Sequence, residues 1–360
     1  MQAMSHGNAR PSQANPTTRS AELEAEPSGL ILQETFASSR QSMMTVLRDL
    51  LRRKEATAVL ILVLLCLSLA AMNENFVSER NLTLVARSLS FVGIASLGAM
   101  VVLSAGQLDL SVGSCMGLAG VLAAYFTVNL GLSDAAVLVL VLAAGGFYGL
   151  VNGALVVGLG LNSLILTLAT GLMGRGLIYA LTNGMPISGF SRGLRYLGVG
   201  FYLGIPIPVW MMAILACVFT WLMARTTFGW RIYAIGGNEE AARLSGVPVG
   251  RLKILAFVIA GIMGAFGGLL LTARLGSGEI SVATGYELDV IAAAVIGGLK
   301  FGGGGSGVSA VGILLGVAIM SVLRSALSLM DVPSAFQPIV LGGAILLAMG
   351  LERIRAQRTS

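Results

Sequence analysis

The stretch AIGGNEEAARLSGVP, residues 234–248, lies between two long apolar runs and predicts a short helix outside them. Asn238 is a favourable N-cap, because its side-chain oxygen can accept an otherwise unpaired backbone N–H of the first turn. Glu239 and Glu240 then place negative charge at the positive end of the helix dipole, and Arg243 lies near the negative end. The pattern predicts a helix of about two turns that begins after Asn238.

The same stretch contains its own stop signal. Gly246 can adopt the left-handed conformation that ends a helix, and Pro248 prevents the helix from resuming. Helices this short are marginal on their own, so we expect this one to be steadied by docking onto a partner, with Leu244 as a candidate apolar anchor. An ordinary capped loop is the alternative.

The composition around this stretch is that of an integral membrane protein. Of the 360 residues 56% are hydrophobic and 11% are charged, and the mean hydropathy is +0.86. Soluble domains contain about 25% charged residues. The net charge of +6 is better explained by membrane orientation than by binding to nucleic acid, so we expect a lipid bilayer and no nucleic-acid partner.

A membrane-spanning helix needs about 20 apolar residues, with about 17 as the lower limit. The chain therefore reads as an all-α polytopic membrane protein, and an even number of spans places both termini on one side. We expect a polar tail at 1–55, a transmembrane domain at 56–351 and a short basic tail at 352–360. Ten spans are predicted, at 56–72, 87–105, 112–128, 135–158, 163–181, 208–224, 254–271, 288–298, 307–329 and 335–350.

The positions of Lys and Arg orient these spans. Of the 23 basic residues, 16 fall in the tails and loops on the side of the termini and 5 on the other side. Basic residues concentrate in cytoplasmic segments. Both termini and the loop 225–253 are therefore expected in the cytoplasm. The N-terminal tail is expected to be disordered, with an interfacial helix at 38–54 as one possibility.

Two glycine-containing stretches interrupt the apolar pattern, at residues 106–114 and 297–307. Paired interruptions in the two halves of a membrane protein point to a transport pathway. We expect Asp109 and the stretch 297–307, which includes Gly303 and Gly305, to shape its cytoplasmic part, and two plain tight turns are the alternative.

Polar residues in or beside the spans are the candidates for lining such a pathway. Asn and Thr can equally serve as hydrogen-bonding groups between helices, and Arg175 and Arg324 can reach the interface or pair with another helix. The candidates are Asp109, Ser111, Asn152, Asn162, Thr167, Thr170, Arg175, Gly303 and Gly305.

The sequence lacks the motifs of an energy-converting or catalytic subunit. It has no G-x-x-x-x-G-K-[ST] phosphate loop, and its one histidine, His6, lies in the polar tail. Neither a metal-ligand spacing nor a nucleophile–base set is present, so we expect no enzymatic activity and no cofactor. Acidic residues fall near the ends of the expected spans, which argues against an ion-driven carrier and favours a driver supplied by a partner.

Five stretches in this order resemble the permease subunits of bacterial ribose-type ABC importers, within the larger group that includes branched-chain amino-acid permeases. The resemblance covers nearly everything after residue 56. The stretches are LDLSVG at 108–113, NG at 152–153 with TLAT at 167–170, GRG at 174–176, TFG at 227–229 with AIGGNEEAARLSGV at 234–247, and GYELDVIAAAVIGG at 285–298.

The resemblance implies a ten-helix permease of the bacterial inner membrane that works as a homo- or heterodimer. Its implied partners are a cytoplasmic ABC ATPase, which binds the ATP, and a periplasmic binding protein that delivers a sugar. It also implies that the helix at 236–247 couples the permease to the ATPase, through Asn238, Glu239, Glu240, Arg243, Leu244 and Gly246.

Some positions depart from the pattern of that family and leave the solute open. A monosaccharide or related polyol is the leading prediction, and an amino acid or nucleoside carried by an importer of the same build is the alternative. A self-sufficient carrier or channel is less favoured, and a membrane enzyme least. The departures are Gln107 for a usual glycine, Asn162-Ser163 for a common Pro-Phe, Leu299-Lys300-Phe301 for a small polar run, and Arg324-Ser325 for a usual Asn-Gly.

Overall fold

A computed structural model describes residues 54–298, 309–333, 335–343, 346 and 350, and nearly all of them are helical. The longer helices are α2 (Lys54–Met72), α3 (Glu79–Ser104), α4 (Val112–Val128), α5 (Asp134–Gly158), α6 (Ser163–Thr182), α8 (Ile207–Arg225), α11 (Val249–Leu275) and α13 (Ala310–Leu329). The shorter ones are η1 (Glu74–Val77), α7 (Arg192–Val199), α9 (Thr227–Gly237), α10 (Glu239–Leu244) and α12 (Tyr286–Ile296). Two-residue strands form two antiparallel pairs, β1 (Ile187–Ser188) with β4 (Ser277–Gly278) and β2 (Phe201–Tyr202) with β3 (Ile205–Pro206).

The predicted apolar runs coincide with helices. Nine of the ten expected spans correspond to α2, α3, α4, α5, α6, α8, α11, α12 and α13. The tenth, 335–350, is helical at 337–343 and lies partly outside the described residues. Within the described part of the chain, six helices are long and apolar enough to cross a membrane. The all-α polytopic fold is therefore confirmed.

Two features of the helices differ from the prediction. The expected loop 225–253 is itself largely helical, because α9 and α10 fill most of it and α11 begins at Val249 rather than at residue 254. Thr226 caps α9 by accepting from the backbone N–H of Gly229. The pattern of apolar residues alone does not indicate this cap. Helix α12 has only 11 residues, about 17 Å, and is too short to cross alone.

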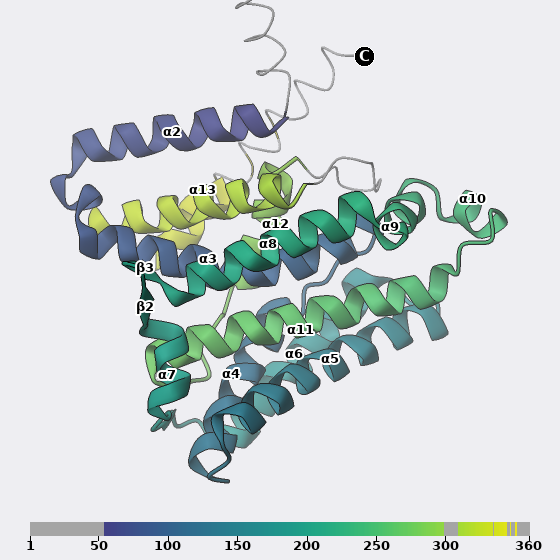
Figure 1. The fold of residues 1–360 in the computed structure, drawn as a ribbon, viewed down its shortest axis with the longest axis horizontal. Coiled ribbons are helices and arrows are strands. Elements are labelled where there is room, and N and C mark those ends of the chain that lie inside the picture. The colour runs from purple at the N-terminus through teal and green to yellow at the C-terminus, as the bar shows by residue number, and fades with distance from the viewer. Residues whose placement is uncertain (1–53, 299–308, 334, 344–345, 347–349, 351–360) are drawn as a thin grey trace, which may run out of the picture. The chain divides into compact units, whose positions relative to one another are not determined.

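Helix α11 is the hub of the fold, and it packs against α3, α4 and α5 (Figure 1). Glycines allow these backbones to meet. A Cβ at Gly149 of α5 would overlap the carbonyl of Phe257, and one at Gly268 of α11 would overlap the carbonyl of Met116 in α4. Small residues at such crossings let helices approach closely in lipid, where hydrophobic burial does not drive them together.

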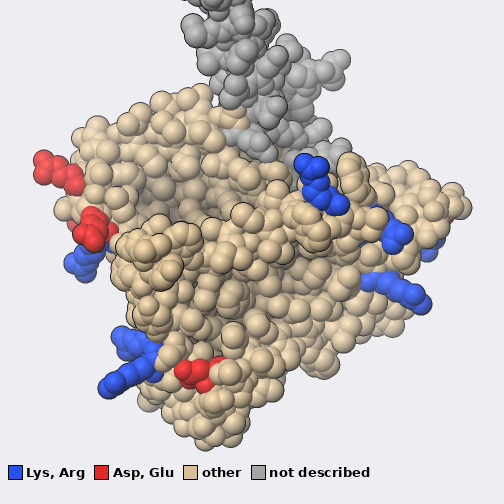
Figure 2. Space-filling model, viewed as in Figure 1, with Lys and Arg blue, Asp and Glu red and all other residues tan. Residues whose placement is uncertain are grey.

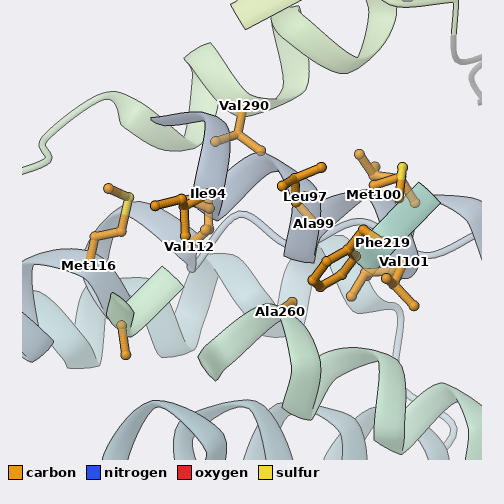
Figure 3. Close-up of a cluster of buried hydrophobic side chains, with 14 of the residues drawn as sticks. Ile94, Leu97, Ala99, Met100, Val101, Val112, Met116, Phe219, Ala260 and Val290 are labelled. Carbon is orange, nitrogen blue, oxygen red and sulfur yellow. The ribbon is translucent and has the colours of Figure 1, made fainter. Parts of the chain in front are cut away.

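Helix α3 lies at the centre of the buried apolar cluster (Figure 3). Ile94, Leu97 and Met100 are fully buried there, and they meet side chains of α4, α8, α11 and α12. A helix that is apolar on all sides is expected in the middle of such a bundle.

The two ends of the helix bundle differ from its middle in the distribution of charged side chains. Helices α9 and α10 lie at one end, and α7 with the β2–β3 hairpin lies at the other (Figure 1). On the face shown in Figure 2, charged side chains gather at these ends and leave an uncharged band between them. This distribution suits a protein whose middle is in lipid and whose ends are in water. The possible helix at 38–54 and the candidates Gly303 and Gly305 lie outside the described residues.

Candidate functional site

Helix α10 has the two caps that its sequence predicts. The Ala241 N–H donates to Asn238 Oδ1 at 2.9 Å. At the other end, Gly246 has a φ of 79°, its N–H donates to the Arg243 carbonyl, and the Val247 N–H donates to the Ala242 carbonyl. This pair of bonds is a Schellman motif, which satisfies the last carbonyls of a helix. The predicted helix and its glycine stop are therefore confirmed.

Glu239 is the centre of an ion network on α10. Its Oε2 accepts from Lys253 Nζ at 2.5 Å, and its Oε1 accepts from Arg243 Nη2 at 3.1 Å. The hydrogen bond from Lys253 and the nearby positive charges hold the pKa of Glu239 below its usual value. Glu240 is more exposed and lies 3.9 Å from Arg243. One face of α10 is thus fixed to α11.

Leu244 is 81% exposed. It is an apolar side chain on a short charged helix at the predicted cytoplasmic end, and the described residues leave most of its surface uncovered. It is therefore free to contact a partner, as its position in the sequence predicts.

A cavity of about 560 Å³ opens beside α10. Its lining includes Glu239, Arg243 and Lys253 together with Gln107 and residues 160–163. Asn162 lies on this turn, where it caps α6 by accepting from the Leu164 N–H. The predicted pathway residue Asn162 thus lines the same cavity as the ion network.

Polar groups also form a seam inside the bundle, beginning at the break before α4. Asp109 is buried, and its carboxylate accepts from both the N–H and the hydroxyl of Ser111. Ser111 in turn accepts from Asn152 Nδ2 at 2.8 Å. Thr167 of α6 accepts from the Leu110 N–H at 2.9 Å. The structure therefore brings four of the predicted pathway residues together around one break in the helices.

The seam continues along α4. The Ser114 and Tyr148 hydroxyls lie 3.2 Å apart, and the Tyr148 hydroxyl donates to the carbonyl of Thr170 at 2.7 Å. Farther along, Arg175 Nη1 donates to the carbonyls of Ile280 and Val282. Arg175 therefore pairs with the turn before α12 rather than with a neighbouring helix.

Two glycines of α4 make room for charged groups from other helices. A Cβ at Gly113 would overlap the Glu287 carboxylate, and a Cβ at Gly117 would lie 3.1 Å from Arg175 Nη1. Arg175 Nη2 and Glu287 Oε2 are both buried without a hydrogen-bond partner among the described residues. Such atoms keep unused hydrogen-bonding capacity at the centre of the protein.

The second intramembrane arginine is paired across two helices. Arg324 Nη2 of α13 lies 2.7 Å from Asp289 of α12, whose side chain is 5% exposed. The neighbouring Ser325 hydroxyl donates to Asn81 of α3 at 2.8 Å. The Arg324-Ser325 departure from the family pattern thus supplies contacts between three helices.

Several residues of these sites were missed by reasoning from sequence. Lys253 reads as one of several basic residues in a cytoplasmic loop, Tyr148 as part of an apolar run, and Glu287 as the end of a span. Their partners are distant in sequence, so no local spacing identifies them. Within the described residues, no three His, Cys, Asp or Glu side chains gather as a metal site requires.

Residues 81–349 match the family model described as the permease component of the branched-chain amino acid transport system. The L-arabinose ABC transporter permease protein AraH of Azospirillum brasilense is 37% identical over 302 residues, which cover 82% of this chain and 87% of that protein. The ribose import permease protein RbsC of Bacillus subtilis is 38% identical over 295 residues, covering 81% and 90%.

The xylose transport system permease protein XylH of Haemophilus influenzae is 32% identical and covers 82% of this chain and 94% of that protein. No solved structure matches the chain. The family model covers the helices from α3 to α13 and includes α10, the seam and the hub helix. The chain therefore belongs to the family of branched-chain amino acid transport system permease components, and it is a multi-pass protein of the bacterial inner membrane.

Proposed function

We propose that this chain is the membrane-spanning permease subunit of an ATP-driven importer for a monosaccharide or related polyol. The observation that carries this proposal is its similarity, over more than 80% of its length, to permeases named for arabinose, ribose and xylose. These three are pentoses, so a pentose is the first class of solute to test. The chain itself is a permease and not an enzyme.

The proposed partners are a cytoplasmic ABC ATPase, a periplasmic binding protein and a second permease subunit, identical or related. ATP is bound by the ATPase and not by this chain. The capped helix α10 supports the contact with the ATPase, because it is anchored on one face and exposes Leu244 and Glu240 on the other. Asn238 and Gly246 set the length of this helix through its caps.

The proposed pathway follows the polar seam from Asp109 past Ser111, Asn152 and Thr167 toward Thr170 and Arg175. Hydroxyl-rich solutes need hydrogen-bonding groups, and the seam is a continuous series of them in an apolar bundle. Asn162, Gly303 and Gly305 are proposed for its cytoplasmic end. In this arrangement 56–351 is the permease domain, and 1–55 and 352–360 are cytoplasmic tails.

The test is reconstitution of the permease with the ATPase and binding protein encoded beside it. Proteoliposomes are supplied with labelled arabinose, ribose, xylose or leucine, with ATP or with a non-hydrolysable analogue. We expect uptake of a sugar that requires ATP hydrolysis and the binding protein. Uptake of leucine alone would select the amino-acid importer, and uptake without ATP would select a self-sufficient carrier.

A further inference from the structure

Within the described residues, helix α10 packs on α9 and α11. It has six residues, about 9 Å, and Ala242 is its one buried residue. Its backbone continues from α9 through the bond from the Asn238 N–H to the Ala234 carbonyl. A helix this short is marginal on its own, so contacts with longer elements help to fix its orientation.

Lys253 supplies that attachment from the second turn of α11. Its side chain is 10% exposed, and Nζ lies 2.5 Å from Glu239 Oε2. A largely buried ammonium group needs a paired anion, because its hydration is lost on burial. Among the described residues, this is the ion pair that joins α10 to α11, since Arg243 and Glu240 belong to α10 itself.

Helix α11 is suited to carry a displacement into the membrane. It is 27 residues long, about 40 Å, and its backbone touches those of α5 at Gly145 and of α4 at Met116. At such close glycine contacts, no compressible layer of side chains separates the two helices. A push on the first turns of α11 is therefore passed directly to α4, which carries Ser114 of the seam.

The cavity beside α10 leaves room for this movement. Glu239 and Lys253 line it, and so do Gln107 and Ser163. Ser163 accepts from the Leu108 N–H at 3.1 Å, so the lining of the cavity is connected to the break before α4. Tilting α10 and α11 would widen or narrow the gap between the ion network and the cytoplasmic end of the seam.

We infer that Lys253 is a positioning residue for coupling, which transmits the movement of α10 to the hub helix through its ion pair with Glu239. The inference rests on the proposed function, and it names the residue that makes α10 and α11 move as one body. Without this pair, the ATPase can still bind α10 and hydrolyse ATP, but its movement tilts α10 alone and is not transmitted to α11.

The experiment uses the full importer in proteoliposomes, with ATP hydrolysis and sugar uptake measured in the same sample. Lys253→Met removes the charge and keeps the length of the side chain, and Lys253→Arg restores the charge. Arg251→Met is the matched control, since Arg251 is an exposed basic residue in the same turn of α11.

For Lys253→Met we expect the ATPase to co-purify and ATP hydrolysis to continue, while sugar moved per ATP falls by about tenfold. Lys253→Arg should recover most of this ratio, and Arg251→Met should match the wild type. An unchanged ratio in Lys253→Met would overturn the inference. So would an equal loss of hydrolysis and uptake, because that pattern is a defect in assembly rather than coupling.

A second variant keeps the test valid if Lys253→Met fails to accumulate. Glu239→Lys combined with Lys253→Glu reverses the pair, and it should regain coupling that Glu239→Lys alone lacks. If the ATPase co-purifies normally with the reversed pair and coupling is still no better than in Glu239→Lys alone, the inference is contradicted. Failure of the proposed function is a different result, since wild-type proteoliposomes would then show no ATP-dependent sugar uptake.

Discussion

Charged side chains inside the membrane domain are held by groups from other helices. Asp289 and Arg324 form a buried pair between α12 and α13, and Arg175 donates to carbonyls of the segment before α12. A charge in lipid is costly, so such residues face the interior and find partners there. Whether a substitution of one of these residues is tolerated therefore depends on whether its partner is left unpaired.

Arg324→Met should destabilise the protein by about 3 kcal/mol, because it leaves the Asp289 carboxylate buried without its partner. Adding Asp289→Leu removes that unpaired charge and should recover much of the loss. Thermal unfolding in detergent measures both. Arg192→Met, at an exposed position, serves as the control. Equal melting temperatures for Arg324→Met and the wild type would show that the pair contributes no stability.

Gly113→Ala should also destabilise the protein, by about 1–3 kcal/mol, because its Cβ would overlap the Glu287 carboxylate and lie 2.9 Å from the Ala283 carbonyl. Gly158→Ala is the matched control, since a Cβ there has no neighbour within 4 Å. The control should be neutral or slightly stabilising. If the two variants melt alike, the close contact between α4 and α12 is not formed.

Among the elements, α10 combines a fixed face with a free one. Leu244→Asp changes a side chain that is 81% exposed, so the permease should fold and reach the membrane normally. Burial of an apolar anchor carries much of the energy of a contact, and we expect this variant to weaken co-purification of the ATPase by about tenfold or more and to abolish uptake. Glu240→Ala should do less, because rim charges mostly set specificity. Normal assembly and uptake in Leu244→Asp would exclude α10 as the coupling element.

The attachment of α10 should resist moderate acid. The pKa of Glu239 lies below its ordinary value of 4.5, chiefly because Lys253 donates a hydrogen bond to the carboxylate. A lowered pKa in the folded state means that the stability from this pair is complete above pH 4.5 and is lost as the pH falls through the folded-state value. The protection factors of the α10 amides in hydrogen exchange should therefore be equal at pH 5.5 and 7.5. In Glu239→Gln the protection factors should be lower at both pH values. A wild-type protection factor that is lower at pH 5.5 than at pH 7.5 would contradict the assignment.

For the whole molecule, the two ends of the bundle should lie on opposite sides of the membrane. Ser245 ends α10, and Leu203 is 77% exposed at the tip of the β2–β3 hairpin. In a background without native cysteines, Leu203→Cys should react with an impermeant thiol reagent in intact spheroplasts. Ser245→Cys should react only after the membrane is opened. Labelling of Ser245→Cys from outside would refute the orientation, and with it the docking of an ATPase on α10.

The sequence by itself determined the features that depend on local composition. Apolar runs of sufficient length must become helices in lipid, because every backbone group has to be satisfied within the segment, and so nine expected spans coincide with helices. The caps of α10 were equally predictable, since Asn238 and Gly246 act on backbone groups within a few residues of themselves. The stretches that carry the family resemblance are likewise local, and the comparisons confirm them.

Only the tertiary structure decided which of these local elements act together. Lys253 lies 14 residues from Glu239, and Arg324 lies 35 residues from Asp289. Glu287 fits against Gly113 from another helix. Such contacts depend on how helices cross and on which glycines allow their backbones to meet. These contacts depend on the packing of the whole bundle, and no short stretch of sequence contains that information.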